Sequence, residues 1–101
     1  MRRFIFWIKE SKLEKVMMKY IQLQNLKMIE NKTAIFFMGG GSNFADVTYG
    51  KYDNVLSIRE GFLDNVTSFF SVHESYSEKI VVKYFKNVYK FKIKEVNVFD
   101  A

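Results

Sequence analysis

The chain of 101 residues contains no cysteine and one histidine, His73. Without cysteine it can form neither a disulfide framework nor a thiolate nucleophile or cysteine-based zinc site. One histidine cannot build a histidine-rich metal site. Its neighbours Glu74, Ser75 and Ser77 are more typical of a turn than of a nucleophile–base pair. We therefore expect a protein that is not an enzyme and that holds no metal ion or cofactor.

The chain also lacks a long hydrophobic run. The apolar stretch after Arg2 and Arg3, from Phe4 to Ile8, has five residues. A signal peptide needs ~7–15 apolar residues and a membrane span ~20. We expect residues 3–8 to form a first β-strand in a cytoplasmic protein with no membrane partner. Proline is absent and lysine far outnumbers arginine, which indicates an AT-rich coding sequence, as in many phages and low-GC bacteria.

Apolar and aromatic residues are abundant. Hydrophobic residues make up 49% of the chain and aromatic residues 18%. This composition predicts one globular domain over residues 1–101, which buries ~60–70% of its unfolded surface on folding. The rings bring more apolar area than so small a core easily hides. A ligand-facing aromatic surface, or a homodimer, is therefore favoured.

Charge is unevenly distributed around the net value of +5. Residues 1–32 and 79–101 are basic, whereas residues 33–78 contain six acidic residues against Lys51 and Arg59. This arrangement differs from that of a uniformly basic nucleic-acid binder. Four of the acidic residues could be imagined around a cation, but their spacing matches no known loop, so we interpret them as a solvated face or as partners of lysines. They are Asp46, Asp53, Glu60 and Asp64.

Local patterns predict several elements. Ser11-Lys12-Leu13-Glu14 fits a capping box and precedes apolar residues at helical spacing, which predicts a helix over 12–24. The segment after it is either a continuation of this helix to residue 31 or a short strand over 26–29. We further expect a buried strand over 34–38, a loop from the glycine triplet to residue 54, a strand over 55–58 and a helix over 62–72.

The last quarter of the chain predicts a β-hairpin around Lys86-Asn87. In this register Tyr84 pairs with Tyr89, Val82 with Phe91 and Ile80 with Ile93 on one face, whereas Val81 lies on the other face opposite Lys92. The opposite face carries five lysines, namely Lys79, Lys83, Lys90, Lys92 and Lys94. A change of parity after the hairpin predicts a β-bulge or strand end at residues 94–95.

The resulting element order predicts an α+β fold of the ferredoxin-like split βαβ type. It is strand, helix, strand, strand, helix, strand, with an added C-terminal strand. Two helices would cover one face of an antiparallel sheet. This fold hosts many activities and does not indicate a function by itself.

The lysine face is the best functional candidate from the sequence. It predicts binding of an anionic ligand, nucleic acid or a nucleotide, with Tyr49 and Tyr52 available for stacking. Gly39, Gly40 and Gly41 could contribute backbone N–H groups to a phosphate site. Their spacing matches neither standard phosphate-binding fingerprint, so a flexible loop is the better interpretation.

Three other interpretations remain open. The lysines could protect a sheet edge from aggregation. The protein could inhibit a host protein or defence complex, as small phage and mobile-element proteins do, with the acidic loop over residues 49–53 mimicking phosphate. It could also sequester a nucleotide signal in a pocket of a dimer.

Overall fold

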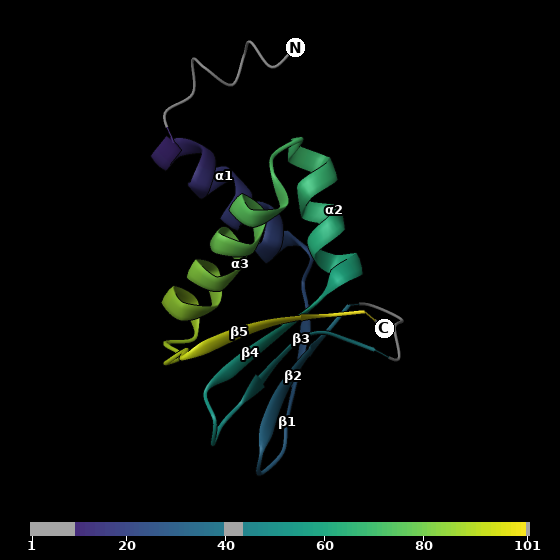
Figure 1. Ribbon diagram of the computed structural model, residues 1–101, viewed down its shortest axis with the longest axis vertical. Helices are drawn as coiled ribbons and strands as arrows, with labels where there is room; N and C mark the ends of the chain where they lie inside the picture. Colours follow the sequence, from purple (N-terminus) through teal and green to yellow (C-terminus); the bar gives the residue numbers. More distant parts are fainter. Residues whose placement is uncertain (1–9, 40–43, 101) are drawn as a thin grey trace.

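The computed structural model describes residues 10–39 and 44–100, which contain three helices and five strands. In chain order these are α1 (Glu10–Leu23), β1 (Lys27–Glu30), β2 (Ala34–Met38), β3 (Ala45–Gly50), β4 (Val55–Arg59), α2 (Glu60–Phe70), α3 (Glu74–Val88) and β5 (Glu95–Phe99). The helices lie together on one side of a single sheet (Figure 1). Within the described residues, no helix is long and apolar enough to cross a bilayer.

The sheet is mixed, and its strands are arranged in chain order from β1 to β5. The first four strands pair antiparallel as a meander, in which Phe37 lies opposite Val47 and Val47 lies opposite Ile58. The register of β2 and β3 shifts between Phe37 and Met38, and Met38 pairs with Ala45. The fifth strand pairs parallel to β4. A parallel pair needs a long crossover, which α2 and α3 supply.

One hydrophobic core joins the sheet to all three helices. Alternate strand residues point into it, because successive side chains of a strand face opposite ways. The fully buried members include Phe37 of β2, Leu56 of β4, Met17 of α1, Leu63 of α2 and Phe85 of α3. Burial of each such side chain contributes ~1.5–3 kcal/mol. The opposite sheet face is covered by no helix of the described part of the chain.

The predicted hairpin over residues 79–94 is wrong, because α3 runs from Glu74 to Val88. Ile80, Val81, Tyr84 and Phe85 recur at helical spacing and are all buried. In a strand, Val81 and Phe85 would have faced the lysines, whereas in a helix they join the core. Only residues 89–94, which connect α3 to β5, remain outside regular structure.

Most other local predictions are confirmed. The helices over 12–24 and 62–72 correspond to α1 and α2, and the strands over 34–38 and 55–58 to β2 and β4. The strand alternative after α1 is correct and corresponds to β1. The predicted loop up to residue 54 is wrong in part, because it contains β3. The predicted strand over 3–8 lies outside the described residues.

The α+β class is therefore confirmed. The ferredoxin-like arrangement is not, because the hairpin on which it depended is a helix and the sheet is mixed rather than antiparallel. Three helices, instead of the expected two, cover the sheet.

Candidate anion-binding surface and a tyrosine-lined pocket

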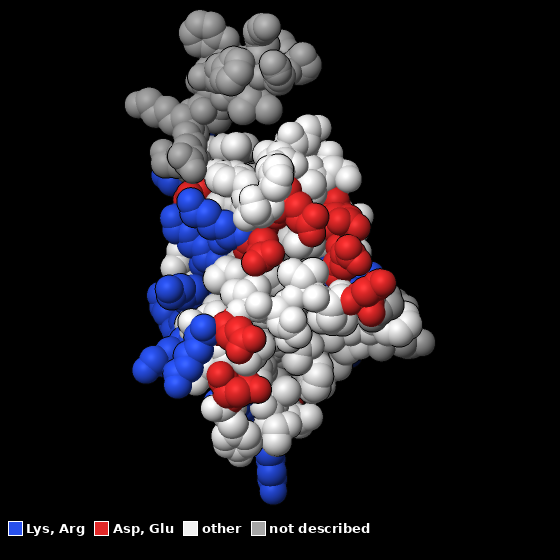
Figure 2. Space-filling model, in the orientation of Figure 1, with Lys and Arg blue, Asp and Glu red and all other residues white. Residues whose placement is uncertain are grey.

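Six exposed lysines lie between residues 79 and 94, a stretch without any acidic residue. We call them the lysine surface: Lys79, Lys83, Lys86, Lys90, Lys92 and Lys94. The first three are spaced to share the solvent face of α3, about 6 and 4.5 Å apart along its axis. Basic residues gather along the side of the molecule that α3 occupies, and acidic residues gather toward α2 (Figure 2).

Few of these lysines have a partner. Lys83 Nζ lies 2.9 Å from Glu14 Oε1 on α1. The Lys83 side chain is 45% exposed, so the pair contributes only ~0.2–1 kcal/mol. Lys79 Nζ lies 6.0 Å from the centre of the Tyr76 ring, at the outer limit of a cation–π contact. The other four lysines form no ion pair within the described residues.

The loop over residues 89–94 is fixed to the sheet by its alternate side chains. Phe91 stacks on Tyr49 with ring centres 4.0 Å apart and planes within 3°. Lys94 donates its backbone N–H to the Asn54 carbonyl oxygen at 2.8 Å. With Phe91 and Ile93 packed against the core, the three lysines between and beside them face solvent.

Tyr49 has a structural role that the sequence did not predict. It is 6% exposed, and its hydroxyl donates to the Lys92 carbonyl oxygen at 2.7 Å. The same hydroxyl accepts from Asn54 Nδ2 at 2.7 Å. The ring and the hydroxyl are therefore both engaged within the protein, and stacking of Tyr49 on a ligand stays a prediction.

The other predicted ligand residues are dispersed. Tyr52 is 78% exposed on the turn between β3 and β4, two residues before Asn54. Gly39 lies against Asp46, where an added Cβ would come within 2.8 Å of Asp46 Oδ2. Gly40 and Gly41 lie outside the described residues. Since Gly39 approaches a carboxylate, its surroundings do not favour a bound phosphate.

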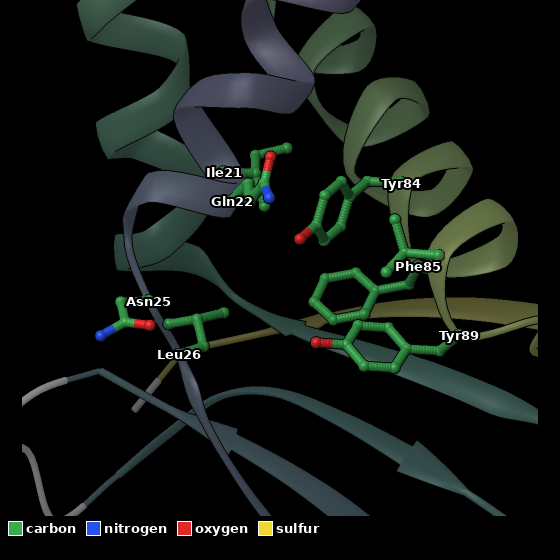
Figure 3. A pocket seen from close by; sticks show the side chains of 8 residues that line it. Ile21, Gln22, Asn25, Leu26, Tyr84, Phe85 and Tyr89 are labelled. Atoms are coloured by element: carbon green, nitrogen blue, oxygen red, sulfur yellow. The ribbon is translucent and has the colours of Figure 1, made fainter.

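A pocket of about 260 Å³ lies between the C-terminal ends of α1 and α3 (Figure 3). The hydroxyls of Tyr84 and Tyr89 point into it, and Gln22 and Asn25 line it with their amides. Within the described residues, neither hydroxyl has a hydrogen-bond partner. Burial raises the pKa of Tyr84, and the neighbouring Tyr89 raises it further. The pocket therefore offers neutral donors and acceptors and no charge.

The sequence pattern did not single out this pocket. The sequence pattern places Tyr84 and Tyr89 opposite each other on the paired strands of a hairpin. Their convergence on one space requires the end of α3 and the turn that follows it. In that turn Lys90 adopts a positive φ of 61°. The helical spacing of the apolar residues of α3 is the sequence signal that would have predicted this arrangement.

His73 caps α3. Its Nδ1 accepts from the Ser75 backbone N–H at 3.1 Å and lies 2.8 Å from Ser75 Oγ. The ring is exposed, and within the described part of the chain Ser75 alone forms hydrogen bonds with it. Throughout residues 10–39 and 44–100, His, Asp and Glu side chains form no cluster that could hold a metal ion.

Comparison with protein-family models, curated proteins and solved structures finds no match for the chain.

Proposed function

We propose that this protein is a non-enzymatic binding protein whose lysine surface binds nucleic acid through the phosphate backbone. The observation that carries the proposal is the run of six exposed lysines on α3 and the following loop, uninterrupted by an acidic residue. We propose a cytoplasmic setting, where nucleic acid is accessible to a small protein.

Charge concentration supports a polyanion as the ligand. Neighbouring like charges repel, and an anionic polymer relieves that repulsion while releasing its own counterions. Three of the lysines lie on a helix, which has no unpaired strand groups. Protection of a sheet edge therefore explains fewer of them than the sequence suggested.

Recognition of this kind is expected to be insensitive to base sequence. Lysine ammonium groups contact phosphates and carry little base information by themselves. The aromatic residues beside the lysines, Phe91 and Tyr89, stack inside the protein with ring centres 5.5 Å apart. We therefore propose that charge, rather than base stacking, supplies most of the affinity.

Salt dependence tests the proposal with a defined magnitude. Five lysines of the surface lack an ion-pair partner among the described residues, so full engagement on B-DNA predicts a slope of log affinity against log salt of about −4.5. Lys86→Gln/Lys90→Gln/Lys92→Gln should lower its magnitude to about 1.8. Fluorescence anisotropy of a labelled duplex titrated with the full chain at several salt concentrations measures both slopes.

The matched control is Lys12→Gln/Lys27→Gln/Lys32→Gln, which removes the same charge from exposed positions elsewhere. Its slope should stay close to that of the parent protein. Equal losses in the two triple variants would show that net charge alone governs binding and would contradict the proposal. Absence of binding at low salt would also contradict it.

A further inference from the structure

A second surface is an apolar groove of about 510 Å³ between α1 and the C-terminal end of α2. We call it the α1–α2 groove. Its apolar lining consists of Val16, Tyr20, Leu23, Phe69 and Phe70. Leu23 is 68% exposed and Phe69 is 65% exposed, which is unusual for side chains of this size in adjacent positions.

The groove is the product of a second apolar stripe on α1. Met17 and Ile21 face the core and are almost completely buried. Val16, Tyr20 and Leu23 follow helical spacing on a neighbouring face, toward α2, and Val16 and Leu23 remain exposed. Tyr20 packs against the core, but the core does not account for Val16 and Leu23.

The groove is rigid where it meets α2. The Tyr20 ring stacks on Phe69 with ring centres 4.4 Å apart and meets Phe70 edge-on at 5.4 Å. Phe69 and Phe70 also contact each other at 5.0 Å. Because these rings pack on one another, little conformational entropy would be lost in ordering them when a ligand binds.

Positive charge borders the groove. Lys12, Lys15 and Lys19 line it from α1 at helical spacing, and among the described residues no acidic side chain contributes to its lining. None of the three forms an ion pair within the described residues. Glu14, the acidic residue between them, is engaged with Lys83 on α3. A complementary ligand must therefore bring its own carboxylates.

We propose that the α1–α2 groove binds one amphipathic α-helix of a partner protein, whose apolar stripe is flanked by Asp or Glu. The lysines would pair with those carboxylates while the stripe covers Val16, Leu23 and Phe69. The lining runs from Lys12 to Leu23, about 17 Å along α1, which matches about three turns of a partner helix. Helix-in-groove binding by residues at i, i+3, i+4 and i+7 has this geometry.

A second copy of the chain fits less well. A two-fold dimer would place the groove against itself, and the described lining of the groove has no acidic residue to meet its lysines. Glu60 and Asp64 are spaced from Phe69 so that they lie on another side of α2. The charge of the groove therefore favours an acidic helix of a different protein.

The test uses the full chain and two fluorescent model peptides of about four helical turns. Both have leucines at i, i+3, i+4 and i+7, one with glutamates and the other with lysines beside the stripe. The glutamate peptide should bind about tenfold or more tightly than the lysine peptide. Lys12→Glu/Lys15→Glu/Lys19→Glu should reverse that preference.

Variants of exposed apolar residues locate the site. Leu23→Ser and Phe69→Ser should each weaken binding of the glutamate peptide about tenfold. Val88→Ser, at a position 52% exposed on α3, is the matched control and should bind like the parent protein. Because all three positions are exposed, circular dichroism should show a folded protein in each case.

Several results would overturn the proposal. The first is equal affinity for the two peptides. The second is a loss of peptide affinity in Val88→Ser as large as that in Leu23→Ser and Phe69→Ser. The third is a concentration-dependent dimer, seen by light scattering, that Leu23→Ser abolishes, since it would assign the groove to a second copy. The fourth is binding to phosphatidylglycerol vesicles, lost in Leu23→Ser, without peptide binding. The proposal is independent of the lysine surface, so Lys86→Gln/Lys90→Gln/Lys92→Gln should leave peptide affinity unchanged.

Discussion

Replacement of Tyr49 by phenylalanine should destabilise the protein without removing its binding surface. The variant keeps the ring that stacks on Phe91 and deletes the hydroxyl that joins Lys92 and Asn54 at 2.7 Å each. A net loss of ~0.5–1.5 kcal/mol per hydrogen bond gives a cost of about 2 kcal/mol. For a domain of this size, that cost lowers the melting temperature by about 8 °C or more.

Urea unfolding followed by far-ultraviolet circular dichroism measures the free energy of unfolding. Tyr52→Phe is the control, because Tyr52 is 78% exposed, and it should change stability by less than ~0.5 kcal/mol. Asn54 has a positive φ of 58°, so Asn54→Gly removes its side chain without backbone strain. Combined with Tyr49→Phe in a double-mutant cycle, it should reveal coupling of about 1 kcal/mol.

The structural role of Tyr49 makes a second, independent prediction. Tyr49→Phe should retain the salt slope of nucleic-acid binding, because all six lysines remain. A variant as stable as the parent protein but weaker in binding would refute the reasoning and restore Tyr49 as a ligand residue.

Three further predictions concern stability. Asp46 Oδ1 lies 2.8–2.9 Å from the Arg59 guanidinium, with the two side chains 9% and 25% exposed. Asp46→Ala should therefore lower the free energy of unfolding in urea by about 2 kcal/mol, because it leaves the Arg59 charge unpaired. Adding Arg59→Met should recover part of that loss, and no recovery would contradict this explanation. The folded-state pKa of Tyr84 is raised above its ordinary value of 10.0. The stability that the neutral Tyr84 contributes is therefore complete below pH 10.0 and is lost as the pH rises through its folded-state pKa. Alkaline thermal melts should show less decline in Tyr84→Phe, and parallel declines would argue against this. His73→Ala should lower the stability of the protein by about 1 kcal/mol through loss of the cap on α3, whereas His73→Asn, which keeps a capping side chain, should retain that stability in thermal melts. Equal melting temperatures of the two variants would contradict the capping role.

The hairpin prediction is wrong because the sequence of residues 79–88 is compatible with both a strand and a helix. Ile80, Val82 and Tyr84 would share one face of a strand and Lys79 and Lys83 the other, and β-branched and aromatic side chains favour strands. Val81 and Phe85 break the alternation, and the strand register had to leave Val81 among the lysines. That misfit was the available evidence for a helix. In the structure Val81 and Phe85 are fully buried.

The missed strand β3 has a different cause. Asp46, Thr48 and Gly50 give it a polar appearance typical of a loop. They alternate with Val47 and Tyr49, which are buried, and Asp46 is also buried, where it pairs with Arg59. Strand β3 therefore had a readable period-two pattern, but glycine and aspartate at alternate positions obscured it.

The candidate surfaces were predictable to unequal degrees. Exposure of the lysines follows from sequence, since either a helix or a hairpin separates them from the apolar residues. The role of Tyr49 does not, because its partner Lys92 is 43 positions away and the contact depends on tertiary structure. The α1–α2 groove was hidden because Val16 and Met17 both fit one apolar helix face, and only packing shows that Val16 stays exposed.

The pairing of β5 with β4 has a consequence for how the molecule is made. Until residues 95–99 emerge from the ribosome, β4 lacks its parallel neighbour and presents an open row of backbone groups. A chain without residues 95–99 would expose this row to other chains as a template for intermolecular pairing. Completion of the sheet thus depends on residues 95–99, so a bulky insertion directly after Phe99 should impair solubility during expression more than the same insertion on a long spacer.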